Sequence, residues 1–138
     1  MYTGIVQGLE KILDVRQGDG FSTLVVSNTL HFFHDVFIGA SVAINGTCLT
    51  ATRIDLNANQ VHFDVSDLTR RLTTLGTLQA GDEVKIERSA KGGMENRVHN
   101  LYGHIEGTAT VKQLSRHGET LHDDYRSEER RVGKECRS

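Results

Sequence analysis

Short runs of β-branched and other apolar residues, separated by turn-forming residues, recur along most of this sequence and constrain its fold more than any other feature. The clearest pair lies at residues 41–44 and 48–54, which flank Asn45-Gly46, a dipeptide that favours a tight two-residue hairpin turn. Similar runs lie at residues 5–15, 22–27, 61–65, 83–88 and 105–114. Roughly six or seven short strands at this spacing predict an all-β barrel or sandwich. A small closed barrel is favoured because closure removes exposed sheet edges.

One or two short helices are expected beside the strands. Residues 30–37 predict a helix because their large apolar side chains recur at helical spacing. Residues 67–74 predict a second helix, with Asp67 as its N-cap. A further hairpin is expected around residues 57–59, leading into residues 61–65, whose alternate apolar side chains share one face.

The composition is that of one ordinary globular domain. The chain has 138 residues, 37% of them hydrophobic, and no apolar run approaches the ~20 residues of a membrane span. Its 16 Lys and Arg and 18 Asp and Glu give a net charge of -2, which argues against a nucleic-acid partner. Cys48 and Cys136 are too few for a disulfide framework. The N-terminus lacks the features of a secretory signal, so we expect a cytoplasmic protein with no membrane partner.

The C-terminal end has a different composition. Residues 126–138 contain five Lys or Arg, three Glu and a single aliphatic residue, Val132, so they cannot bury enough apolar surface to become ordered. They are either a natural basic tail for an acidic partner or a cloning or read-through scar, and we favour the scar. We therefore predict a barrel over residues 1–114, followed by a linker remnant and a disordered tail over residues 115–138.

Two groups of side chains could carry chemistry. The hairpin brings Ser41, Cys48 and Thr50 toward one end of a barrel, where they offer a thiol and two hydroxyls; the alternative is that Cys48 is simply a small buried residue. His99 and His104 precede the last expected strand, and an imidazole can act as a general acid or base near neutral pH. A solvated histidine is the alternative for both. No third ligand is placed beside them, so no metal is expected.

Taken together, the motifs resemble the riboflavin synthase family, and specifically its N-terminal lumazine-binding repeat. The resemblance rests first on the opening Met-Tyr-Thr-Gly-Ile-Val-Gln-Gly at residues 1–8 and on Gly-Ala-Ser-Val-Ala-Ile-Asn-Gly-Thr-Cys-Leu-Thr at residues 39–50. Further motifs follow in family order: Val61-His62-Phe63-Asp64, Leu75-Gly76, Gly81-Asp82-x-Val84, Glu87-Arg88-Ser89-Ala90-Lys91 and Gly103-His104-Ile105. They span residues 1–114.

This resemblance implies a six-stranded antiparallel Greek-key barrel that binds 6,7-dimethyl-8-ribityllumazine. The family's enzyme takes two such molecules and transfers a four-carbon unit between them, giving riboflavin and a pyrimidinedione, with no metal or organic cofactor. Carried over by position, Ser41, Cys48 and His104 are the polar groups nearest the chemistry. The residues expected to contact the ligand are Gly4, Ile5, Val6, Cys48, Leu49, Thr50, Asp64, Val65, Ser66, Asp67, Leu68, Thr69, Gly103, His104 and Ile105.

The chain also departs from the family pattern. Leu68 stands where the family usually has glutamate, Arg97 where it has glycine and Tyr102 where it has serine. The family's enzyme carries two such barrels and assembles as a trimer whose active sites are shared between subunits, whereas this chain contains one repeat. We expect an isolated barrel to form a dimer.

Three functions remain open from the sequence. The chain is the N-terminal half of a riboflavin synthase, a non-catalytic lumazine or flavin carrier, or a degraded paralogue with a structural role. Retention of Ser41, Cys48 and His104 favours the enzyme over the carrier.

Overall fold

The computed structural model describes residues 1–90, 103–118 and 120–127. The chain divides into two compact units, Met1–Ile105 and Glu106–Ser138, and each is described by itself. Among the described residues, no helix is long and apolar enough to cross a membrane.

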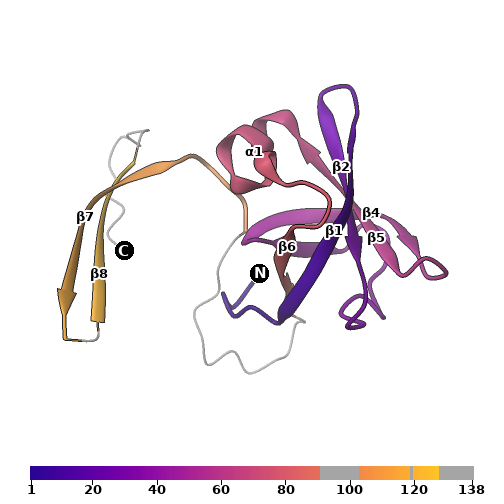
Figure 1. Cartoon of the computed structure of the whole chain (residues 1–138), viewed down its shortest axis with the longest axis horizontal. Helices are drawn as coiled ribbons and strands as arrows, with labels where there is room; N and C mark the ends of the chain where they lie inside the picture. Colours follow the sequence, from indigo (N-terminus) through magenta and orange to yellow (C-terminus); the bar gives the residue numbers. More distant parts are fainter. Residues whose placement is uncertain (91–102, 119, 128–138) are drawn as a thin grey trace. The chain divides into compact units, whose positions relative to one another are not determined.

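The first unit is a closed barrel of six antiparallel strands (Figure 1), which confirms the predicted Greek-key fold. The strands are β1 (Gly8–Gln17), β2 (Phe21–Ser27), β3 (Ser41–Ile44), β4 (Thr47–Asp55), β5 (Gln60–Ser66) and β6 (Glu83–Arg88). Their order around the barrel is β1-β2-β5-β4-β3-β6. The short helices α1 (Asp67–Leu72) and η1 (Thr74–Thr77) connect β5 to β6.

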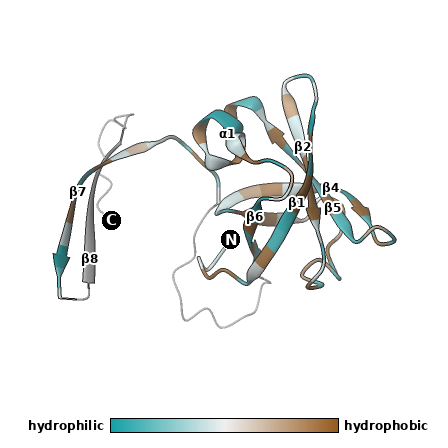
Figure 2. Ribbon diagram, viewed as in Figure 1, coloured by the Kyte–Doolittle hydropathy of each residue, from teal (hydrophilic) through white to brown (hydrophobic). Residues whose placement is uncertain are grey.

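Alternation along the strands builds the core. On β5, Val61, Phe63 and Val65 are at most 1% exposed. Asp64 and Ser66, on either side of Val65, are exposed. Figure 2 shows the same mixing of hydrophobic and hydrophilic residues along the barrel strands. The predicted inward face of residues 61–65 is therefore confirmed.

Both predicted hairpins are present. Asn45 and Gly46 adopt φ of 49° and 81°, the left-handed conformations that a tight two-residue turn requires, and they join β3 to β4. The turn between β4 and β5 ends on Asn59, whose φ is 51°. Asparagine tolerates this region better than other side chains do, so the local sequence fits both turns.

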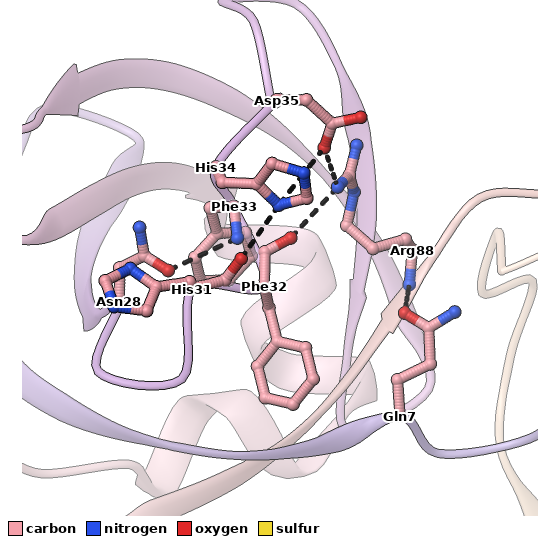
Figure 3. A network of polar contacts seen from close by, with 8 residues as sticks. All are labelled: Gln7, Asn28, His31, Phe32, Phe33, His34, Asp35 and Arg88. Atoms are coloured by element: carbon pink, nitrogen blue, oxygen red, sulfur yellow. Dashed lines mark hydrogen bonds and ion pairs between the residues drawn. The ribbon is translucent and has the colours of Figure 1, made fainter.

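The helix predicted at residues 30–37 is wrong, since this segment is a series of turns. His31 has a φ of 57°, which no right-handed helix accommodates. The segment is fixed instead by contacts from outside it (Figure 3): Asn28 Oδ1 accepts a hydrogen bond from Phe33 N, and Arg88 donates to Phe32 O and to Asp35 Oδ1 at 2.6 Å. Long-range partners replace the helical hydrogen bonds here.

The second predicted helix is shorter than expected and is capped differently. α1 ends at Leu72, and the chain then forms η1. Its N-cap is Ser66 rather than Asp67, because the Ser66 hydroxyl accepts a hydrogen bond from Thr69 N at 3.2 Å.

The strand predicted at residues 105–114 does not join the barrel. β6 pairs with both β1 and β3, which closes the sheet and leaves no edge for a further strand. The second unit instead holds β7 (Ala109–His117) paired with β8 (Thr120–Ser127). Strand structure therefore continues into the segment predicted as a linker, and the division of the chain after residue 114 stays a prediction.

Candidate ligand-binding site

The outer face of the β3–β4 hairpin gathers three of the predicted site residues. Thr47, Leu49 and Ala51 are buried in the barrel, so Cys48 and Thr50 between them point outward. In the register of the two strands, Ser41 lies opposite Thr50 and Ala43 opposite Cys48. One thiol and two hydroxyls therefore share a single outward patch, while Leu49 can offer a ligand only its backbone.

Cys48 is held from two directions. The Tyr2 hydroxyl donates a hydrogen bond to Cys48 Sγ at 3.1 Å, and the Cys48 backbone N–H donates to Gly103 O at 2.8 Å. This close approach of the two backbones requires glycine at residue 103, because an added Cβ would lie 2.8 Å from Cys48 Cβ. The thiol is consequently fixed in position and only partly exposed.

The Tyr2 phenol is itself almost completely buried, with 4% of its surface exposed. Burial raises its pKa well above the ordinary value of 10, and the hydrogen bond with Cys48 and the nearby charge of Glu87 raise it further. The phenol therefore stays protonated and acts as a hydrogen-bond donor to the sulfur.

Glu87 anchors the N-terminal segment beside this patch. Its Oε1 accepts hydrogen bonds from Thr3 N at 2.6 Å, Thr3 Oγ1 at 3.0 Å and Gly4 N at 3.1 Å. The next two residues, Ile5 and Val6, are 58% and 49% exposed. Two apolar side chains are thus presented on a segment whose backbone is tied down.

The outer face of β5 supplies a further polar group, the carboxylate of Asp64. Ala51 of β4 pairs with Phe63 of β5. Thr50 directly precedes Ala51 and Asp64 directly follows Phe63, and both are exposed. The Thr23 hydroxyl donates to Asp64 Oδ1 at 2.7 Å, which orients the carboxylate.

The remaining members of the predicted 64–69 set differ in how they are presented. Ser66 and Thr69 are bonded to each other through their hydroxyls, Leu68 is 58% exposed, and Val65 points into the core.

His104 and Ile105 follow Gly103 directly, and both side chains are exposed. The Gly103–Cys48 backbone contact places the start of this segment at the thiol. His99, Arg97 and Tyr102 lie outside the described residues. Within the part of the chain that the structure describes, no group of three His, Cys, Asp or Glu side chains is placed to hold a metal ion.

Tyr2 and Glu87 also contribute to the arrangement, although the sequence marked them only as members of family motifs and did not predict them as site residues. Each acts through a partner far away in sequence, so its role cannot be read from its neighbours. A thiol, hydroxyls and a carboxylate next to exposed apolar side chains suit a flat heteroaromatic ligand with a polar edge, since such sites combine apolar area with a few placed polar groups.

Comparisons with known proteins point to one family. The model of the lumazine binding domain matches residues 3–89. Riboflavin synthase of Escherichia coli (strain K12) is 45% identical over 114 residues, which cover 83% of this chain and 53% of that protein. Riboflavin synthase of Schizosaccharomyces pombe is 32% identical over 130 residues, 91% of this chain and 60% of that protein. The chain spans about half the length of the curated relatives it matches.

Solved structures of LumP are also similar to this chain. LumP complexed with flavin mononucleotide has a TM-score of 0.68 and 29% identity, covering 88% of this chain and 66% of LumP. LumP complexed with 6,7-dimethyl-8-(1'-D-ribityl) lumazine has a TM-score of 0.65 at the same identity and covers 88% of this chain and 63% of LumP.

Proposed function

Because the chain belongs to the lumazine-binding domain family, we propose that it is the N-terminal, ligand-binding half of a riboflavin synthase. It binds 6,7-dimethyl-8-ribityllumazine and riboflavin on the outer face of β3 and β4. The observation that carries this proposal is the common outward patch of Ser41, Cys48 and Thr50, with the Cys48 thiol held by Tyr2 and Gly103.

In the proposed reaction, two molecules of the lumazine exchange a four-carbon unit and leave as riboflavin and a pyrimidinedione. It starts with loss of a proton from the acidic 7-methyl group of one lumazine and nucleophilic addition at the ring of the other. Ser41, Cys48 and His104 are the groups we assign to this chemistry, with His104 as the general acid or base. Holding two large reactants in register supplies much of the rate enhancement.

Titration with riboflavin tests the binding step. We expect one riboflavin per chain, seen as quenching of flavin fluorescence at micromolar concentrations. Cys48→Ala should weaken binding, whereas Cys136→Ala, which removes the chain's other cysteine, should not. No binding at micromolar riboflavin would refute the proposal.

A second candidate function is a non-catalytic carrier of lumazine or flavin. It is favoured by the LumP structures, whose ligands are a lumazine, riboflavin and flavin mononucleotide. Turnover separates the two functions. In a two-repeat protein, Cys48→Ser and His104→Gln should each lower the rate of riboflavin formation if the site is catalytic, whereas a carrier should form no riboflavin even before substitution.

The assembly is also part of the proposal. The trimer of the two-repeat enzyme stays a prediction, as does the cytoplasmic location. For the isolated barrel we propose a dimer, because Ile5 and Val6 are left exposed on an ordered segment. Light scattering that shows a monomer would contradict this.

A further inference from the structure

A shallow cavity of about 510 Å³, largely open to solvent, lies between α1 and η1, and none of the comparisons assigns a function to it. Its lining residues are Asp67, Arg70, Arg71, Thr73, Gly76 and Thr77. Gly76 brings the two elements close together, since a Cβ there would lie 2.5 Å from Arg70 O. The cavity therefore has backbone walls that a side chain at residue 76 would disrupt.

The lining is positively charged in a chain whose net charge is negative. Two guanidinium groups face one carboxylate, that of Asp67. Arg70 is already engaged, since its Nη1 donates to Gln17 Oε1 at 3.1 Å and lies 3.8 Å from Asp67 Oδ1. Arg71 is exposed and has no hydrogen-bond or ion-pair partner among the described residues.

The two threonine hydroxyls that line the cavity already donate hydrogen bonds within the chain, so they are not the donors that a ligand would use. Thr73 Oγ1 donates to Thr69 O at 2.7 Å, and Thr77 Oγ1 donates to Thr74 O at 3.0 Å. The donors left for a ligand are those of Arg71 and the remaining N–H groups of Arg70. A guanidinium presents its donors as a rigid fork that matches the oxygens of a phosphate.

The cavity adjoins the segment that we expect to contact the ligand. Asp67 belongs both to its lining and to the segment 64–69 that we expect to contact the ligand. Thr69, bonded to Ser66, immediately precedes Arg70. A ligand bound along residues 64–69 would therefore have two arginines at the end of that segment.

We propose that this cavity is a subsite for the phosphate monoester at the end of a flavin's ribityl chain, with Arg71 as its main ligand and Arg70 as its second. This inference rests on the proposed function, because the ring of the same flavin occupies the β3–β4 face. It predicts that the chain binds flavin mononucleotide more tightly than riboflavin, a specificity that the family assignment does not give.

The test compares flavin mononucleotide with riboflavin by fluorescence quenching on the whole chain. We expect flavin mononucleotide to bind about tenfold more tightly, the ratio that one added charge-assisted contact supplies. Arg71→Gln should bring the ratio close to one through loss of affinity for flavin mononucleotide. Arg53→Gln is the matched control, because Arg53 is an exposed arginine on β4 outside the cavity and should leave the ratio unchanged.

The outcomes separate the two proposals. Equal affinity for both flavins in the unmodified chain, or a ratio that survives Arg71→Gln, would overturn the subsite and leave the proposed function standing. Failure of both flavins to bind would refute the proposed function and the subsite with it. Inorganic phosphate alone should compete weakly with flavin mononucleotide and not with riboflavin. If inorganic phosphate instead bound as tightly as flavin mononucleotide, the cavity would be a free-phosphate site, and the flavin assignment would be wrong.

Discussion

Replacement of Glu87 tests whether the N-terminal segment is held in place for ligand binding. Glu87 is 8% exposed, and one of its oxygens accepts all three hydrogen bonds from Thr3 and Gly4. In Glu87→Ala these donors lose their acceptor. Gly4, Ile5 and Val6, which we expect to contact the ligand, are then released from the barrel.

The magnitude follows from the contacts. A hydrogen bond to a charged acceptor contributes roughly 1.5–3 kcal/mol, and ordering the backbone of a residue costs about 1–2 kcal/mol. Three such bonds, less the cost of ordering Thr3 and Gly4, leave about 3 kcal/mol of unfolding free energy that Glu87→Ala should remove. Glu87→Gln keeps a carbonyl acceptor but not the charge, so it should cost about half as much.

Urea denaturation followed by circular dichroism measures this, and riboflavin titration measures the loss of binding. For a domain of this size, about 3 kcal/mol lowers the urea midpoint by about 1.5–2 M at unchanged slope. Glu83→Ala is the matched control: Glu83 is an exposed glutamate at the start of the same strand, and its removal should stay within about 0.5 kcal/mol. If Glu87→Ala were no more destabilising than Glu83→Ala, the anchoring argument would fail.

Three further changes have defined outcomes. Tyr2→Phe removes only the hydroxyl that donates to Cys48, so it should lower the unfolding free energy by about 1 kcal/mol and speed alkylation of Cys48, measured by peptide mass spectrometry. Gly103→Ala should weaken riboflavin binding and lower the melting temperature, because its Cβ would lie 3.0 Å from Cys48 N, while Gly107→Ala, with nothing within 4 Å, should do neither. Burial, and then the charges of Arg16 and Arg53, lower the pKa of His62 below 6.5, so the unfolded chain takes up this proton first as the pH falls. The urea midpoint should therefore drop between about pH 7.5 and about pH 5.5, and His62→Gln should reduce that drop.

Local patterns predicted the strands and hairpins well because each depends on neighbours in sequence. The Asn45-Gly46 turn sets the register that puts Ser41 opposite Thr50, so this part of the candidate site could be predicted from about ten residues of sequence. The same reasoning failed at residues 30–37. There the apolar spacing is helical, but His31 and the distant Arg88 impose turns, and a tertiary contact overrides the local preference.

The supports of the site were beyond prediction for the same reason. Tyr2 and Cys48 are 46 residues apart, and Thr3 and Glu87 are 84 apart. A buried glutamate at the end of β6 has the same local sequence pattern as an exposed one, since Glu83 and Glu87 both lie among alternating charged and apolar residues. Only closure of the barrel distinguishes them, because it brings the N-terminal segment alongside β6.

Closure also bears on the alternative interpretation of Cys48 as a small buried residue. A small buried cysteine would have packed among the core side chains with Leu49 and Ala51, but Cys48 lies on the opposite face of β4 and is partly exposed. A freely solvated thiol would have had no partner, yet its sulfur accepts a hydrogen bond from a buried phenol. An outward-facing thiol that is also fixed in position requires a buried Tyr2 to donate to it and a glycine at residue 103. Ordinary packing of a surface strand requires neither. The position of this sulfur is therefore fixed by residues distant in sequence, and a ligand that contacted it would gain a contact whose ordering cost the fold has already met.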